Sequence, residues 1–165
     1  MKALLPTGRL ALISAAIVAI VAVTELTQGP EAAPVEHWLS TRNTLALAGY
    51  DPVSFHLEGV PKKGAETFST RWNGREWHFS NPLNLSRFIA DPERYAPQFD
   101  GYSVFGMARG KTYKADPQQF DVIDGKLYLS RNAKVRELWR ANPDGFLEQA
   151  ERNWLELRQE LELSG

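Results

Sequence analysis

The chain has 165 residues, the length of one globular domain with a short appendage, and 43% of them are hydrophobic. Its 19 Lys and Arg residues nearly balance 20 Asp and Glu residues, which argues against nucleic-acid binding because that function needs a concentrated basic face. The absence of cysteine excludes disulfides, thiolate metal sites, iron–sulfur clusters and cysteine nucleophiles.

An apolar segment follows a basic N-terminus. Residues 10–23 are apolar except for Ser14, and Lys2 and Arg9 precede them, which is typical of an export signal. The best cleavage motif, Ala22-Val23-Thr24, is poor, so residues 1–24 predict an uncleaved signal-anchor helix that holds the rest of the chain on the periplasmic side of the inner membrane. The alternative is a cleaved signal peptide and a secreted domain. The expected membrane-facing residues are Leu10, Leu12, Ile13, Ile17, Val18, Ile20, Val21 and Val23.

Residues 25–36 contain Gly29, Pro30 and Pro34 and read as a linker, so we expect the folded domain at residues 37–165. The stretch 37–48 fits either a short helix or a strand. Asp51 and Pro52 predict a capped helical stub, because Asp suits the cap and Pro the first helical position.

Two β-hairpins are expected. The first joins residues 67–72 to 76–79 through Asn73-Gly74, and the second joins 120–123 to 126–129 through Asp124-Gly125. In the first hairpin, alternation places Trp77 and Phe79 on one face of the strand and Glu76 and His78 on the other.

Helices are expected after each hairpin. One begins at Pro82 behind a Ser80 or Asn81 cap and carries an apolar stripe, a helical turn follows Asp91-Pro92, and two more helices cover residues 132–140 and the chain from Pro143. The expected inward residues are Leu85, Phe88 and Ile89 in the first, Val135, Leu138 and Trp139 in the third, and Phe146, Ala150, Trp154, Leu157 and Leu161 in the last. This pattern predicts an α+β domain, and no internal repeat is evident.

Two motifs resemble known catalytic loops in part. Residues 106–112 are one residue short of a phosphate-binding loop and do not open a helix, so no nucleotide is expected. Residues 101–106 resemble a nucleophile elbow, but no histidine follows His78, which excludes a serine hydrolase of that chain order.

The remaining site candidates are scattered polar residues. A helical turn that brought His56 back to Asp51 would form a histidine–carboxylate pair. His78 fits a partly buried strand histidine better than a metal ligand. The candidate pocket consists of Tyr50, Asp51, His56, His78, Asp100, Tyr102 and Ser103.

Several blocks in one order resemble the exported YHS-domain proteins. The blocks are residues 46–55, Phe68, 77–80, 88–98, 101–103 and 122–129, and the similarity covers about Asn43 to Trp154. The resemblance implies a small α+β domain of a kind that also occurs attached to metal-related proteins. In those proteins it is thought to bind metal through cysteine-containing motifs.

This chain departs from that pattern where a thiol is expected. Ser103 stands at a position that is ordinarily Cys, and the Phe79-Ser80 strand end also lacks the Cys of the short metal-associated versions. A serine hydroxyl is a poor ligand for a soft metal, so soft-metal binding is not expected here.

Three functional hypotheses remain. The preferred one is a non-catalytic, membrane-anchored accessory or interaction subunit that contacts a membrane protein complex. The alternative is a metal-binding module that holds Cu, Zn or Fe through His, carboxylate or Tyr ligands. An enzyme with a pocket around Tyr50, Asp51, Tyr102 and Ser103 ranks last, because the sequence shows no catalytic constellation.

Overall fold

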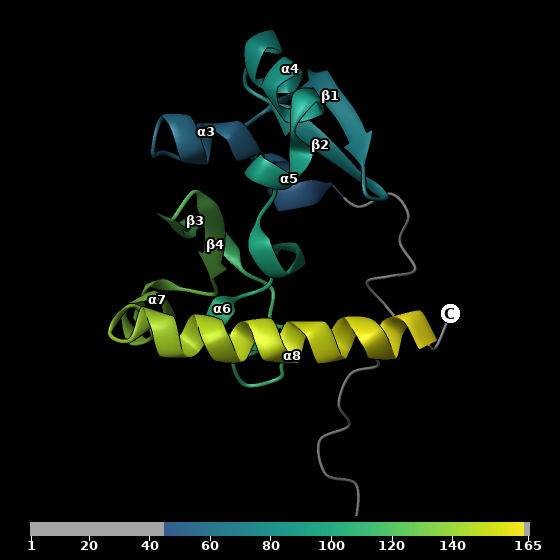
Figure 1. Ribbon diagram of the computed structural model, residues 1–165. Helices are drawn as coiled ribbons and strands as arrows, with labels where there is room; N and C mark the ends of the chain where they lie inside the picture. Colours follow the sequence, from purple (N-terminus) through teal and green to yellow (C-terminus); the bar gives the residue numbers. More distant parts are fainter. Residues whose placement is uncertain (1–44, 164–165) are drawn as a thin grey trace, which may run out of the picture. The chain divides into compact units, whose positions relative to one another are not determined.

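The computed structural model describes residues 45–163, which fold as an α+β unit (Figure 1). By its contacts the chain divides into two units, and the described residues all belong to the second, Thr41–Gly165. The expected signal or anchor segment and the linker lie outside the described residues. Within residues 45–163, no helix combines the length and the apolar character that crossing a membrane requires.

Two separate antiparallel hairpins form the strands. In the first, β1 (Ala65–Trp72) pairs with β2 (Arg75–Phe79), and in the second, β3 (Asp116–Ile123) pairs with β4 (Lys126–Ser130). Both central turn residues of each hairpin have positive φ, 50° and 72° at Asn73-Gly74 and 50° and 74° at Asp124-Gly125. The turns that join a hairpin of this twist need such angles, so both hairpin predictions are confirmed.

The predicted helices are present with the expected caps. These are α3 (Pro52–Leu57), α4 (Pro82–Ala90), α5 (Pro92–Tyr95), α7 (Ala133–Arg140) and α8 (Pro143–Leu163), with a further short helix α6 (Val104–Met107). Asp51, Asn81 and Asn132 each accept a hydrogen bond from the backbone N–H of the first helical turn. The side chains of these cap residues thus satisfy donors that the helix itself leaves free.

Two expected core residues point outward. Ile89 is 58% exposed and Leu138 is 48% exposed, so their predicted places in the apolar stripes are wrong. The other predicted residues of these stripes are inward, with Phe88 and Trp139 buried and Val135 partly buried. Leu85 and Phe88 pack on the first core as expected, and α4 also turns the polar Asn84 inward, which an apolar stripe does not predict.

The elements of the chain occur twice in the same order. Repeat 1 (45–95) has a tight turn at Ala46–Gly49, then α3, β1, β2, α4 and α5, and repeat 2 (97–146) has a turn at Gln98–Gly101, then α6, β3, β4, α7 and the first turn of α8. The strand registers correspond residue by residue and break at the same place. Ala65 pairs with Phe79 and Ser69 with His78, just as Asp116 pairs with Ser130 and Phe120 with Leu129. The structure therefore contains a repeat that the sequence does not reveal.

Each repeat begins with a left-handed turn. Leu47, Ala48 and Gly49 have φ of 49°, 50° and 78°, and the corresponding residues of repeat 2, residues 99–101, have φ of 54°, 54° and 82°. Non-glycine residues enter this region at a steric cost, so the surrounding contacts must hold the turn. This turn is all that the structure describes of the ambiguous stretch 37–48 apart from Leu45.

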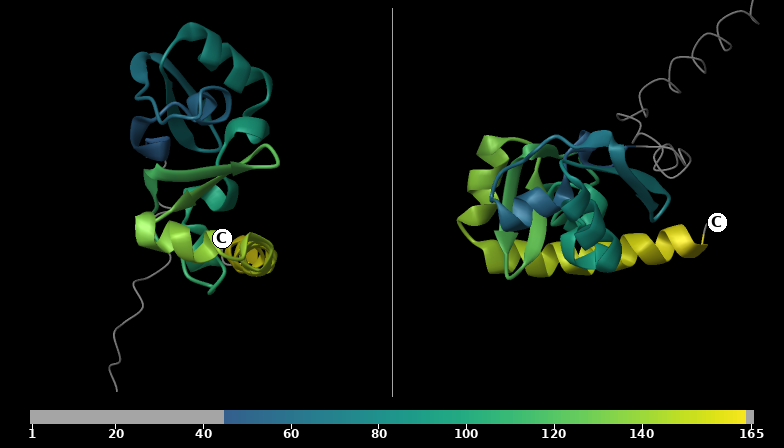
Figure 2. Two further views of the ribbon diagram at one scale, coloured as in Figure 1. Left: turned by 90° about the vertical axis from the view of Figure 1, so that its left-hand side faces the viewer. Right: turned by 90° about the horizontal axis from the view of Figure 1, so that it is seen from above.

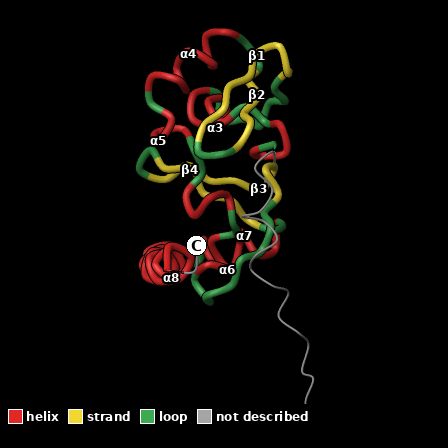
Figure 3. Tube along the Cα trace, turned by 90° about the vertical axis from the view of Figure 1, so that its right-hand side faces the viewer, coloured by secondary structure: helices red, strands yellow, loops and turns green. Residues whose placement is uncertain are grey.

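The two repeats and α8 are stacked. Figures 1 and 3 show α4 and the hairpin β1–β2 at one end, β3–β4 in the middle, and α6 with α8 at the other end. Phe55 of α3 packs against Leu127 and Leu129 of β4, which joins repeat 1 to repeat 2. The apolar stripe of α8 faces α6 and the second core, with Phe146, Ala150, Trp154 and Leu157 packed as expected. The side chain of Leu161, the last residue of the expected stripe, lies outside the described residues. The helix runs along one side of the described part (Figure 2).

Candidate functional site

Asp51 is the most deeply buried acidic side chain of the described part. It caps α3, and Pro52 follows at the first helical position. The side chain has no exposed surface, and its Oδ1 accepts a hydrogen bond of 2.9 Å from the Val53 N–H. The sequence-based expectation of a helix cap at Asp51 is therefore confirmed.

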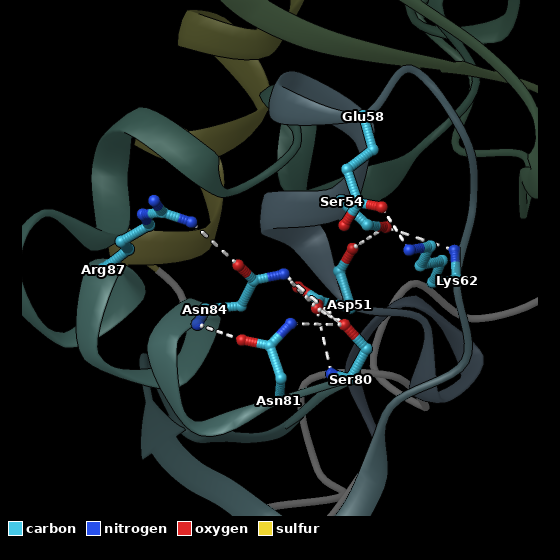
Figure 4. Close-up of polar contacts among 8 residues, drawn as sticks. All are labelled: Asp51, Ser54, Glu58, Lys62, Ser80, Asn81, Asn84 and Arg87. Atoms are coloured by element: carbon cyan, nitrogen blue, oxygen red, sulfur yellow. Dashed lines mark hydrogen bonds and ion pairs between the residues drawn. The ribbon is translucent and has the colours of Figure 1, made fainter.

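The second carboxylate oxygen of Asp51 binds the junction between β2 and α4. Its Oδ2 accepts hydrogen bonds from the Ser80 N–H at 2.9 Å, the Ser80 hydroxyl at 2.6 Å and the Asn84 amide at 2.7 Å (Figure 4). A carboxylate offers about four acceptor positions, and protein donors occupy that number here. The group is thus fully used inside the protein.

The hydrogen bonds continue around Asp51 into three elements. Asn84 accepts from Arg87 at 3.2 Å, and Ser54 donates to the Asp51 carbonyl at 2.8 Å while accepting from the Lys62 N–H at 3.1 Å. Asn81 donates to Ser80 at 3.1 Å (Figure 4). The network ties α3, α4 and the segment before β1 together, and Arg87 links it to the outer part of α4.

Ser103 is the counterpart of Asp51 in repeat 2. The Asp51 N–H donates to the Lys62 carbonyl, and the Ser103 N–H donates to the Tyr113 carbonyl in the same way. Ser103 is 1% exposed, and its Oγ has no hydrogen-bond partner among the described residues. The donors that serve Asp51 are missing because Arg131 and Val135 stand where repeat 1 has Ser80 and Asn84.

Asp100 and Tyr102 form a different cluster with Arg75. Arg75, next to the turn of the first hairpin, makes an ion pair with the Asp100 carboxylate. Burial raises the pKa of Asp100, and the charge of Arg75 and its hydrogen bond act against that rise. Burial also raises the pKa of Tyr102, and the negative charge of Asp100 adds to this effect. The Tyr102 phenol is therefore held in its neutral form, and the Arg75–Asp100 ion pair links repeat 1 to repeat 2.

His78 pairs with Glu76 on the strand face opposite Trp77 and Phe79. The His78 Nε2 lies 2.8 Å from the Glu76 Oε1, and the side chains are 15% and 33% exposed. Trp77 and Phe79 are buried at 4% and 0% exposure, so the predicted alternation is confirmed. In repeat 2 the positions of Glu76 and His78 are taken by Leu127 and Leu129, which are core residues.

His56 does not pair with Asp51. Its ring stands edge-on to the Tyr95 ring at 5.4 Å, and its Nε2 is buried without a hydrogen-bond partner among the described residues. Burial lowers the pKa of His56, a hydrogen bond with the Tyr95 backbone opposes this, and the charge of Arg94 lowers it again. The histidine–carboxylate pair considered from the sequence therefore does not form, because Asp51 binds Ser80 and Asn84 whereas His56 faces Tyr95.

Tyr50 lies on the side of repeat 1 that meets β3. Its hydroxyl accepts a hydrogen bond from the Gln118 amide at 3.2 Å, and the Lys63 ammonium lies 3.9 Å from the centre of its ring. Tyr50 also packs against the cluster of Phe55, Leu127 and Leu129.

The predicted site residues thus have separate partners. Asp100 and Tyr102 share one cluster, whereas Asp51, His56 and His78 each bind different neighbours. No group of three His, Cys, Asp or Glu side chains placed to hold a metal occurs within the described residues. Sequence reasoning missed Ser80, Asn84 and Arg75 as members of these clusters. The available signal was Asn84, a polar residue four before Phe88 on the inward face of α4.

Comparison with family models, curated proteins and solved structures returns no match to this chain.

Proposed function

We propose that this protein is a non-catalytic, membrane-anchored extracytoplasmic domain of YHS-like type that acts as an accessory or interaction subunit of a membrane protein complex. The observation that carries the proposal is the Asp51 network. The carboxylate that most resembles a site residue is fully buried, and four protein donors occupy its acceptor positions. Through these hydrogen bonds the Asp51 side chain holds the start of α3 against the start of α4. This structural use of the carboxylate supports a scaffold role for the domain.

The proposal is tested on the full-length chain in the membranes of its own host. We expect the protein to stay in the membrane fraction after a carbonate wash, and a chemical cross-linker to join it reproducibly to the same membrane protein. A variant whose residues 1–24 are replaced by a cleavable signal should reach the same compartment, leave the membrane and lose the cross-link. A chain recovered in the cytoplasm, or one without a reproducible partner, would contradict the proposal.

A metal-binding module is the second candidate, and the His78–Glu76 pair favours it. An imidazole and a carboxylate 2.8 Å apart and partly exposed are two adjacent ligands suited to Cu(II), Zn or Fe. Protein purified without a histidine tag should then contain about one metal ion per chain, and His78→Gln should lose it without unfolding. Metal content near zero in the unmodified chain removes this candidate.

A further inference from the structure

Four exposed basic side chains lie on two segments of repeat 2 that meet at Tyr113. Arg109, Lys111 and Lys114 lie on the loop between α6 and β3, and Arg131 precedes α7. The Arg131 guanidinium lies 5.2 Å from the centre of the Tyr113 ring, which brings the two segments together. We call these five residues the basic patch.

Within the part of the chain that the structure describes, the charges of the basic patch have no ion-pair partner. Residues 101–115 contain no Asp or Glu, and none of the four basic side chains forms an ion pair with residues 45–160. Arg109 instead stacks on the Phe105 ring at 3.6 Å, which fixes its position without neutralising it. The loop lies beyond α8 at the edge of the described part, on the side away from repeat 1 (Figures 1 and 3).

The corresponding loop of repeat 1 uses its basic residues internally. Lys62 pairs with Glu58, and Lys63 donates to the Ala48 carbonyl at 2.7 Å and lies over the Tyr50 ring. The two loops occupy the same place in the repeat, so the contrast does not arise from the fold. Of these two loops, the loop of repeat 2 is the one whose basic side chains form no ion pair with the described residues.

We propose that the basic patch docks the domain on an anionic lipid surface. Arg and Lys side chains near such a surface are each attracted to lipid headgroups, and a Tyr among them suits the polar–apolar boundary of a bilayer. This inference rests on the proposed membrane anchor. The chain from Thr24 to Leu45 spans at most about 75 Å when fully extended, so an anchored domain stays within reach of the bilayer. Under that confinement, weak charge attraction is enough to dock it.

The test uses full-length protein in vesicles of phosphatidylcholine alone or with phosphatidylglycerol. Because the chain has no cysteine, Thr112→Cys accepts a single fluorescent label inside the patch. Lipids with a headgroup-attached quencher should quench the label in anionic vesicles at low salt, and not in neutral vesicles or at high salt. The triple variant R109Q/K111Q/R131Q should reduce the docked-to-free ratio roughly a hundredfold, at about fivefold for each charge removed.

A matched variant removes equal charge elsewhere. K62Q/K63Q/K126Q takes three positive charges from outside the patch and should leave the quenching unchanged. The double reversal K111E/K114E alters only exposed side chains without ion pairs, so it tests the patch even if loss of Arg109 disturbs the loop. Equal quenching in neutral vesicles, or quenching that survives in both patch variants, would overturn the inference.

Two further outcomes separate this inference from its alternatives. If inorganic phosphate releases the label at an ionic strength where chloride does not, the patch binds free phosphate and the lipid assignment is wrong. If a carbonate wash removes the unmodified chain from every vesicle, the anchor itself fails, and the proposed function falls with it. A chain that resists the wash but shows no dependence on lipid charge rejects the docking alone.

Discussion

Asp51 and Ser103 hold corresponding positions at the start of α3 and α6, but their surroundings are opposite. Asp51 accepts four hydrogen bonds, whereas the buried Ser103 hydroxyl makes none with the described residues. A buried polar group contributes to stability only when its partners are present. The polar side chain at this position therefore stabilises repeat 1, where it is Asp51, and destabilises repeat 2, where it is Ser103.

We expect Asp51→Asn to lower the free energy of unfolding by about 2–3 kcal/mol, because the new amide N–H₂ faces the donors of Ser80 or Asn84 and leaves them unpaired. Ser103→Ala is the matched control, and it should change stability by less than about 1 kcal/mol in either direction. Chemical denaturation followed by tryptophan fluorescence measures both. Equal losses of unfolding free energy in the two variants would show that the hydrogen bonds of Asp51 do not stabilise repeat 1 as proposed.

His56 makes stability depend on pH. Burial lowers its pKa in the folded state below the value of 6.5 that the free side chain has. As the pH falls below about 6.5, His56 becomes protonated in the unfolded chain while it stays neutral in the folded chain. The free energy of unfolding therefore decreases with falling pH until the pH passes the folded-state pKa of His56. His56→Gln should lose less stability than the unmodified protein between pH 7.5 and pH 5.5, measured by urea midpoints. An identical loss in both proteins would exclude His56 as the source.

At the scale of elements, the sequence predicts those turns and helix starts that depend on a few adjacent residues. Asn73-Gly74 and Asp124-Gly125 specify the hairpins, and Asn81 and Asn132 specify where α4 and α7 begin, because a turn or a cap depends on a few adjacent residues. The left-handed turns are not predictable in this way, since Leu47 and Phe99 disfavour that backbone. The Asp51 site also escapes prediction beyond its cap, because Ser80 and Asn84 lie 29 and 33 residues away in the chain.

Gly64 directly precedes β1, and the first hairpin needs a glycine there whereas the second hairpin does not. A Cβ on Gly64 would meet the backbone carbon of His78 at 2.3 Å and the nitrogen of Phe79 at 2.5 Å. Repeat 2 has Ala115 at the corresponding position, so the close approach is particular to repeat 1. Gly64→Ala should cost about 2 kcal/mol or more in thermal or chemical unfolding, while Ala115→Gly should cost only about 0.5–1 kcal/mol. If Gly64→Ala left the stability unchanged, the backbone of β2 beside residue 64 would have to shift at little cost, and the predicted steric requirement would be wrong.

At the scale of the whole described part, α3 is one connection between the repeats, beside the Arg75–Asp100 ion pair and the Tyr50–Gln118 hydrogen bond. The polar side of its start is fastened to α4 through Asp51, and its Phe55 enters the apolar cluster of repeat 2, with its ring 4.8 Å from Phe120. In repeat 2 the corresponding helix α6 packs on α8 instead. The helix α8 thus covers the face that a third repeat would otherwise use, which is how arrays of stacked units end.

This arrangement predicts different outcomes for two large apolar deletions. Phe55→Ala should cost about 3–5 kcal/mol and also weaken the coupling of the repeats, because it removes an apolar contact between them. Phe88→Ala, inside the first core, should cost a similar amount while leaving that contact in place. Hydrogen exchange read by mass spectrometry distinguishes them. In Phe55→Ala, β3 and β4 should lose protection at the face toward α3 while β1 and β2 keep theirs, whereas in Phe88→Ala the loss should centre on β1, β2 and α4. Uniform loss of protection in both variants would mean that the repeats fold as one cooperative body and that α3 is not the boundary between them.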